Sequence, residues 1–358
     1  MCADDYLSFL RRTETDGGPA ARGGTRPVPV LLAPLSGVTD LHVRRIARRL
    51  GASAVVSEMV AAAELARGDQ EAQLRAEGSG VDPHVVQLAG CAPEPMAEAA
   101  RIAEANGADV IDINMGCPAK VVTGVASGSA LMRDIEGATR ILAAVRGAVQ
   151  IPVTVKMRLG WDHANLNAPD LARRAEGLGL NAVTVHGRTR QQFYKDQADW
   201  GAIRAVVEAV AIPVIANGDI ATLAQAQTCL ARSGAAGLMV GRAAVGRPWL
   251  VGALAAGLAG RAVSVLSGAE KAALAVEHYQ GLLALYGLRM GVRHARKHLA
   301  AYAEAGGGLS AEDRMRLLTT TDPAIATALL ARAFGENIGE DMGKDIGETL
   351  PHAIGEAA

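Results

Sequence analysis

Aromatic side chains are scarce in this chain of 358 residues, since Phe, Tyr and Trp together make up only 3% of it. A nucleic-acid module that stacks bases on aromatic platforms needs more of these residues, so the sequence disfavours that class of protein. Hydrophobic residues nevertheless make up 50% of the chain, and Ala, Val, Leu and Ile must therefore fill the core. Leu, Ile and Val are typical of the buried strands of a parallel β-sheet.

Cysteines, net charge and long apolar runs are also limited. Cys2, Cys91, Cys117 and Cys229 form no CxxC pair, which argues against a zinc site or a disulfide framework. We therefore expect a reduced, cytoplasmic protein without a metal. No apolar run reaches the roughly 18 residues of a membrane span, and no export signal is visible. The net charge of −1 offers no general attraction to polyanions, so any contact with nucleic acid must depend on local patches.

Short apolar runs alternate with amphipathic stretches from residue 28 onward, which is the pattern of repeated βα units. We count eight runs, the number that closes a (β/α)8 TIM barrel of the α/β class. The runs are 30–33, 54–57, 84–88, 110–114, 153–156, 182–186, 213–216 and 237–240.

The pattern predicts four segments. Residues 1–27 form a loosely ordered extension, and residues 28–260 form the barrel. Residues 261–334 read as a small helical domain, with helices predicted over 269–286, 289–303 and 311–330 and no strand between them. Residues 335–358 form an acidic, Gly-rich tail to which no role is assigned. Nothing in the sequence indicates an oligomer, so a monomer is the default.

Polar residues gather just after the predicted strands, at the end where barrel enzymes place their active sites. One such residue alone could be structural, but six at equivalent positions favour an enzyme. They are Asn114, Cys117, Lys156, His186, Asn217 and Arg242.

Two of these residues predict specific chemistry. Cys117 lies in a Gly-Cys-Pro turn, and because a free thiol titrates near pH 8.5 it is mostly protonated at neutral pH and can act as a general acid. A free cysteine is more often a buried apolar residue, and that alternative stays open. Lys156 either extends to the rim or points inward at an anion, such as the negative pyrimidine end of a reduced flavin.

The loops after the seventh and eighth strands commonly bind phosphate in barrels. Here they contain Asn217-Gly218-Asp219 and Gly241-Arg242, so a phosphate-bearing cofactor such as FMN fits. The chain has no well-placed GxGxxG motif, which argues against a Rossmann dinucleotide site. His186 is followed closely by Arg188 and Arg190, a group suited to a polar, anionic or base-edge ligand, although His186 could instead cap a helix or bond to a loop.

Seven motifs occur in the order and spacing of one known family: LAPLSGVTD, VVQLAG, DINMGCPAK, VTVKMRLGW, VHGRTR, IPVIANGDI and MVGRAAVGRPW. Over residues 28–303 the chain resembles the tRNA-dihydrouridine synthases, and GVRHARKHLAAY resembles their bacterial DusB-like subgroup. The resemblance implies that NADPH, or NADH, reduces an FMN held in the barrel mouth. The flavin then delivers hydride to C6 of a tRNA uridine, and a cysteine protonates C5. The sequence itself does not show which uridine is modified, and the DusB-like resemblance suggests position 17.

Carried over by motif, the resemblance makes Cys117 the acid and places His186 at the edge between flavin and uracil, with Asn114 and Arg188 contacting uracil. The residues implied around FMN are Pro34, Leu35, Ser36, Gln87, Lys156, Asn217, Gly218, Asp219, Gly241 and Arg242. A basic stripe at helical spacing would bind tRNA phosphates, unless it is an ordinary solvated helix face. The stripe consists of Arg289, Arg293, Arg296 and Lys297.

Two features depart from the family pattern. Residues 121–125 lack the basic side chains that often follow the cysteine, and the acidic tail has no counterpart that we recognise. Two other functions remain open: a flavin barrel that acts on a free pyrimidine, and a non-catalytic RNA-binding protein. The first leaves the basic helical domain without a purpose, and the second leaves Cys117 and Lys156 without one.

Overall fold

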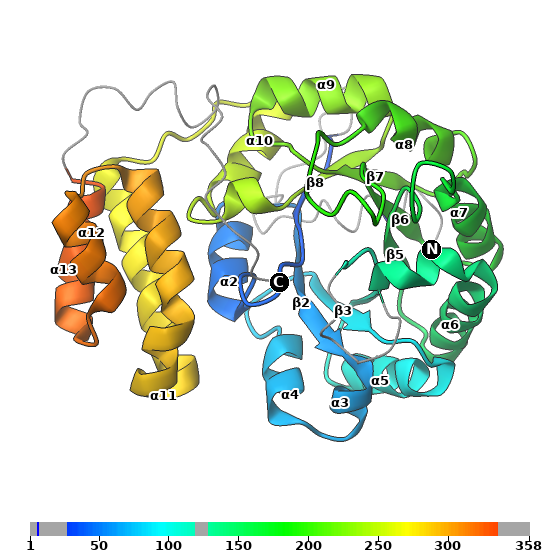
Figure 1. Ribbon diagram of the computed structural model, residues 1–358, viewed down its shortest axis with the longest axis horizontal. Helices are drawn as coiled ribbons and strands as arrows, with labels where there is room; N and C mark the ends of the chain where they lie inside the picture. Colours follow the sequence, from blue (N-terminus) through cyan, green and yellow to red (C-terminus); the bar gives the residue numbers. More distant parts are fainter. Residues whose placement is uncertain (1–5, 7–26, 119–127, 336–358) are drawn as a thin grey trace, which may run out of the picture.

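The computed structural model describes Tyr6, residues 27–118 and residues 128–335. The predicted extension and acidic tail lie almost wholly outside these residues, as does the loop 121–125. Eight parallel strands close a barrel in chain order, with β1 hydrogen-bonded to both β2 and β8 (Figure 1). The strands are β1 Val30–Leu32, β2 Ala54–Ala61, β3 His84–Ala89, β4 Val110–Met115, β5 Val153–Arg158, β6 Ala182–His186, β7 Val214–Asn217 and β8 Gly237–Val240.

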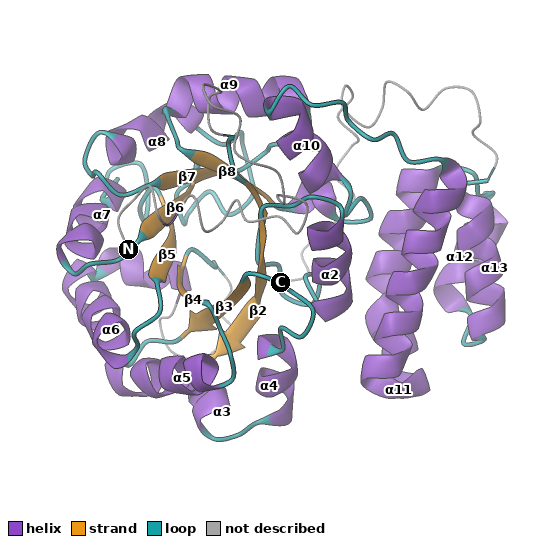
Figure 2. Cartoon of the chain, turned by 180° about the vertical axis from the view of Figure 1, so that it is seen from behind, coloured by secondary structure: helices purple, strands orange, loops and turns teal. Residues whose placement is uncertain are grey.

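Helices surround the barrel (Figure 2), which confirms the predicted (β/α)8 fold. Helix α2 begins where Asp40 accepts hydrogen bonds from two backbone N–H groups, and α9 begins with a capping box formed by Thr222 and Gln225. The barrel helices are α2 Leu41–Arg49, α3 Ala62–Ala66, α4 Gln70–Ala76, α5 Pro93–Ala105, α6 Ile135–Ala148, α7 Ala168–Gly177, α8 Trp200–Val207, α9 Leu223–Ser233 and α10 Leu250–Leu258, with 3-10 turns η1 Gly128–Arg133 and η2 Arg242–Ala244.

Alternate residues of each strand face opposite sides, so the barrel has two apolar layers. One layer lies between strands and helices and includes Val86, Ile111 and Val155. The other lies inside the barrel and includes Val85 and Val110. The small and β-branched side chains expected from the composition therefore fill both layers.

Tyr6 belongs to the inner layer, although it precedes the first strand by more than twenty residues. Its side chain is 4% exposed, and its hydroxyl group forms a hydrogen bond with Thr154. Burial and the nearby Asp112 raise the pKa of Tyr6. The hydroxyl is therefore neutral, and its ring fills part of the barrel interior.

Strand β2 contains a β-bulge. Val56 pairs with Val85 and Met59 pairs with Gln87, so two residues of β2 lie opposite one residue of β3. Bulges redirect side chains at barrel rims. This one contains Glu58, which is 4% exposed.

Helix α11, Gly268–Gly306, is a hairpin rather than one straight rod. Gly287 lies inside it with φ 71° and ψ 166°, a left-handed φ that suits glycine. His278 and His298 lie on either side of this break, and their ring centroids are 4.5 Å apart. Twenty residues of straight helix would separate them by about 30 Å. The two helices predicted over 269–286 and 289–303 are therefore present and pack against each other.

The single helix predicted over 311–330 is wrong. Two helices occupy this segment, α12 Ala311–Thr319 and α13 Pro323–Ala333. Proline restricts the residue before it to extended backbone, and Asp322 at that position caps α13 by accepting a hydrogen bond from Ala324 N. The Asp-Pro pair was a readable stop signal.

Helices α11 to α13 pack beside the barrel next to α2 (Figures 1 and 2). Ile46 of α2 and Trp249 belong to the same buried apolar cluster as the interior of these helices. Arg49 and Glu277 add a two-pronged ion pair at 2.6 and 2.9 Å on the surface. The predicted boundary at residue 260 falls between α10 and α11. No described helix is both long enough and apolar enough to span a membrane.

Candidate active site

A chain of hydrogen bonds crosses the barrel interior below its carboxyl-end mouth. Asp112 accepts from Gln87 Nε2 at 2.6 Å and from Thr154 Oγ1 at 2.6 Å, while Gln87 Oε1 accepts from Asn114 Nδ2 at 2.7 Å. Burial raises the pKa of Asp112, although both hydrogen bonds and Lys156 oppose this shift. The sequence singled out Gln87 and Asn114 but assigned no role to Asp112 or Thr154.

Asn114 holds the turn that contains Cys117. Its Oδ1 accepts hydrogen bonds from the backbone nitrogens of Gly116 at 3.1 Å and Cys117 at 3.0 Å. On the other side of the turn, Ser129 donates to the Cys117 carbonyl from its backbone nitrogen at 2.9 Å and from its hydroxyl at 2.8 Å. Cys117 is a partly buried free thiol, and the turn is fixed from both sides.

Arg158 joins this turn to the loop after β6. Its Nε donates to Gly116 O at 2.7 Å, and its Nη1 donates to the carbonyls of Thr189 and Phe193 at 2.9 and 2.7 Å. Burial lowers the pKa of Arg158 to about 10, and the guanidinium stays charged. This residue was not predicted from the sequence, although it is a charged residue at the end of a buried strand.

Lys156 lies beside Asn114 in the β4–β5 register, on the inward side of the strand. Burial lowers its pKa to about 8, and the positive Arg158 adds to this shift, while Asp112 and Cys117 oppose it. The side chain therefore still carries its charge at neutral pH. It supplies a cation within the mouth, close to the cysteine.

His186 is neutral, because burial and then the surrounding cations hold its pKa well below the ordinary value. Arg188 Nη1 lies 3.2 Å from His186 Nε2. A guanidinium can only donate, so Nε2 accepts and the imidazole proton is on Nδ1. His186 pairs with Asn217 in the strand register.

Arg188 and Arg242 converge on Asp219 instead of standing free. Arg188 is 2% exposed and donates to both carboxylate oxygens of Asp219, at 3.1 and 2.5 Å. Arg242 Nη2 donates to Asp219 Oδ1 at 3.0 Å. Burial opposes these interactions, but together they lower the pKa of Asp219. Arg188 also donates to the carbonyls of Lys195 and Asp196. Most of its guanidinium donors are therefore engaged by the loop after β6 and by Asp219.

The backbone after β7 passes very close to its neighbours. Gly218 has φ 121°, and a Cβ there would lie 2.8 Å from His186 Cδ2 and 2.7 Å from Ala198 Cβ. Asn217 Nδ2 donates to Met239 O at 2.8 Å, which ties β7 to β8. Gly241 follows β8, and a Cβ there would lie 3.9 Å from Leu35 Cδ2.

The loop Pro34–Leu35–Ser36, which was also predicted to contact the cofactor, follows β1. Thr39 fixes this turn by accepting from Leu35 N at 2.9 Å through its hydroxyl. Gly37 N donates to Glu58 Oε2. The structure therefore brings the predicted residues from β1, β3, β5, β7 and β8 to one mouth.

Arginines and aromatic rings lie together on the loop after β6, and the arginines were noted in the sequence but the rings were not. Arg190 lies over Phe193, 4.4 Å from the ring centroid, and its Nη2 donates to Pro118 O at 3.4 Å. Tyr194 lies near both Arg158 and Arg242, at 5.5 and 5.1 Å. Phe193 and Tyr194 are 41% and 42% exposed. These rings are therefore partly exposed while guanidinium groups already lie over them.

The predicted basic stripe lies on the second half of α11. All four side chains have exposed surface. The ammonium group of Lys297, however, lies against Gly37, since a methyl group on that glycine would overlap Nζ. Arg289, Arg293 and Arg296 therefore form a separate exposed group, and Lys297 reaches back to the barrel.

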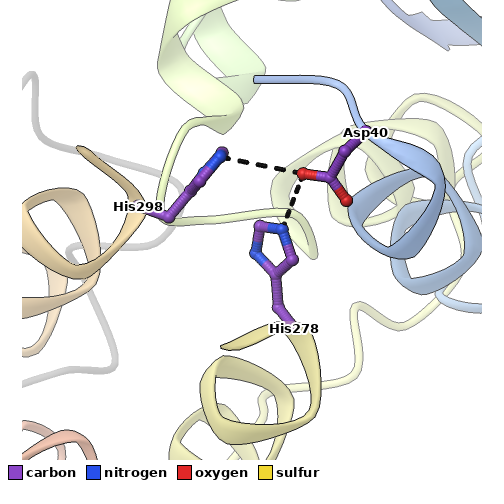
Figure 3. Close-up of side chains that lie close together, drawn as sticks. All are labelled: Asp40, His278 and His298. Atoms are coloured by element: carbon purple, nitrogen blue, oxygen red, sulfur yellow. Dashed lines mark hydrogen bonds and ion pairs between the residues drawn. The ribbon is translucent and has the colours of Figure 1, made fainter. Parts of the chain in front are cut away.

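A buried cluster at the junction of α2 and α11 has residue types found in metal sites: Asp40, His278 and His298 (Figure 3). Asp40 Oδ2 lies 2.8 Å from His278 Nε2 and 3.7 Å from His298 Nε2, while Oδ1 accepts from two backbone nitrogens. His278 Nδ1 meets Tyr302 Oη at 3.0 Å. These contacts already satisfy the carboxylate, so we interpret the cluster as a hydrogen-bonded junction.

A parallel barrel with a thiol, an ammonium and a neutral imidazole at the carboxyl ends of its strands defines the class: a TIM-barrel enzyme. A family model described as "Dihydrouridine synthase (Dus)" matches residues 31–329. The chain therefore belongs to the dihydrouridine synthase family, whose enzymes reduce uridine in tRNA.

Similar curated proteins agree with this assignment. The chain is 52% identical over 311 residues to a "Probable tRNA-dihydrouridine synthase" of Rhodobacter capsulatus, which covers 86% of this chain and 95% of the relative. A protein of the same name from Rhizobium leguminosarum is 51% identical over 85% of this chain and 94% of its own length. "tRNA-dihydrouridine synthase B" of Xanthomonas axonopodis is 47% identical over 77% of this chain and 83% of its own length.

Proposed function

We propose that this chain reduces the C5–C6 double bond of uridine in tRNA to 5,6-dihydrouridine, with FMN as cofactor and NADPH as reductant. The observation that carries the proposal is the placement of Cys117 next to Lys156. Asn114 fixes the cysteine turn and is also the register neighbour of the lysine. One mouth thus offers a proton donor and a cation, which the reduction of a pyrimidine beside a flavin requires.

The described residues fit an FMN. Lys156 supplies a positive charge for the pyrimidine end of the ring system, and Arg242, with its side chain 28% exposed, supplies a donor fork for phosphate. Gly241 leaves room for a close approach of the cofactor to the backbone, whereas Gly218 is required by its packing against His186 and Ala198. Pro34, Leu35 and Ser36 would cover one side of the cofactor. Asn217 and Asp219 fix the strand ends that would hold it.

When bound, FMN supplies the hydride for C6 of the uracil. Cys117 donates the proton to C5, so that one hydride and one proton are added in all, and the resulting thiolate lies in the electrostatic field of Lys156 and Arg158. The neutral His186 can bond to the ligand without adding charge. Asn114 keeps the thiol in position, and Gln87 in turn holds Asn114.

The tRNA would lie across the mouth and the second half of α11. Arg289, Arg293 and Arg296 face solvent there and suit phosphates. The target uridine must leave its stack to reach the thiol, as in other enzymes that act on bases. The proposal includes a cytoplasmic location, where a tRNA substrate is found, and a monomer as the default oligomeric state.

The test is turnover with purified protein. Unmodified tRNA, free uridine and free orotate are each incubated with the flavin-loaded enzyme and NADPH, and dihydrouridine or dihydroorotate is measured by mass spectrometry. We expect dihydrouridine in tRNA only. Product from the free pyrimidines alone would favour the small-molecule alternative, and a protein that takes up no flavin would refute the proposal.

A further inference from the structure

Gly37, directly after the loop Pro34–Leu35–Ser36, is held by groups from outside that loop. Its backbone nitrogen donates to Glu58, and its backbone also forms a hydrogen bond with His298 of α11. The ammonium of Lys297 covers its Cα. With φ 67°, Gly37 turns the chain from the cofactor loop into Asp40 and α2.

Glu58 is placed for this contact by the bulge in β2. Its side chain is 5% exposed, and Arg75 Nη1 lies 3.9 Å from its Oε2. A carboxylate this buried needs cations and N–H donors to remain charged. Burial, together with the charge of Asp40, raises the pKa of Glu58, and the Gly37 N–H, Arg75 and Lys297 oppose this rise. Two of these groups, the Gly37 N–H and the Lys297 ammonium, lie at the turn after the loop Pro34–Leu35–Ser36.

We propose that Lys297 and Glu58 are positioning residues for FMN: together they hold the Leu35–Gly37 turn in the shape that binds the cofactor. This inference rests on the proposed function. It gives Lys297 a role different from that of the three arginines on the same helix. Those side chains face solvent, whereas the Lys297 ammonium lies between α11 and the barrel, where burial lowers its pKa against the opposing pull of Glu58 and Asp40.

The test compares Lys297→Met with Arg293→Met, a matched change one helical turn earlier on the same helix. FMN is removed from each protein, its rebinding is followed by flavin fluorescence, and KM and kcat for tRNA are measured at saturating FMN. Lys297→Met should weaken FMN binding about tenfold, a change of about 1.4 kcal/mol in binding free energy, because the turn loses the ammonium group that packs against Gly37. It should also shift the visible spectrum of the bound flavin and leave the KM for tRNA unchanged. Arg293→Met should raise that KM and leave FMN affinity unchanged.

The variant Glu58→Gln tests the other residue of the proposed pair. If both residues act through the same turn, the double variant Glu58→Gln/Lys297→Met should bind FMN no more weakly than the weaker of the two single variants. Urea unfolding of the flavin-free proteins reports any general loss of stability separately. Unchanged FMN affinity in Lys297→Met overturns the proposal, and a raised KM for tRNA in that variant would make Lys297 a phosphate ligand instead. A wild-type protein that binds no FMN would refute the proposed function.

Discussion

The side-chain oxygen of Asn114 lies 3.0 Å from the backbone nitrogen of Cys117 and accepts its hydrogen bond. The cysteine turn is therefore held by a side chain of β4, the strand that leads into it, and does not depend on the loop alone. Cys117→Ala should keep FMN and tRNA affinity and lose turnover by about 10²- to 10⁴-fold, the contribution of a general acid. Steady-state kinetics with a flavin absorbance spectrum measures both effects. Full activity in this variant would remove the thiol from the mechanism.

Lys156 should make FMN binding depend on pH. Its pKa is lowered to about 8, mainly by burial, so the ammonium is present below that pH and is lost as the pH rises through it. FMN affinity should therefore fall between pH 7 and pH 9 in the wild-type protein, and Lys156→Met should bind weakly at both values. Fluorescence titration measures this. An equal pH dependence in the variant would assign the effect to another group.

The exposed arginines of α11 should contribute to tRNA binding through their charge alone. Arg293→Glu/Arg296→Glu should raise the KM for tRNA, and the salt dependence of binding should become shallower by about 0.7 to 0.9 for each phosphate that the variant no longer neutralises. Filter binding between low and moderate salt measures the slope. Arg261→Glu, which changes an exposed residue between α10 and α11, is the control. An unchanged slope would mean that tRNA does not touch this face.

His298 should make the folded protein sensitive to acid. Burial, followed by the charge of His278, lowers its pKa to about 3, whereas the unfolded chain takes up a proton near 6.5. Stability is therefore lost as the pH falls from about 6.5 toward 3. His298→Gln should remove about one proton from the uptake on unfolding at pH 5, measured as the slope of the unfolding free energy against pH. The same change at exposed His163 is the control.

Much of the fold was readable because the strand runs are continuous and apolar. Residues 182–186 and 237–240 coincide with β6 and β8, since parallel strands buried on both sides leave little ambiguity. The break before Pro323 was missed although the polar residues 319–322 interrupt the apolar pattern there and the Asp-Pro pair is a helix stop signal. The residues after the strands also meet at one mouth, as the topology requires.

The sequence did not show which groups the predicted site residues contact. Arg188 was a candidate for contacting uracil, yet its fork is engaged by Asp219 from a different strand. Lys297 was grouped with the arginines by helical spacing, yet its ammonium reaches Gly37. Spacing along one element shows which side chains share a face, but it does not show which distant backbone comes within reach. Asp112 could have been predicted as a site residue, because it lies two residues before Asn114 and therefore on the same side of β4.

The buried position of Tyr6 has a consequence for synthesis. Tyr6 leaves the ribosome before any of the eight strands, but its ring packs in the same cluster as Met239 of the last one. Long-range contacts of this kind form slowly, and a nascent chain that stops short of β8 has no complete cavity for the ring. Complete burial of Tyr6 therefore requires β8, the last of the eight strands to be synthesised.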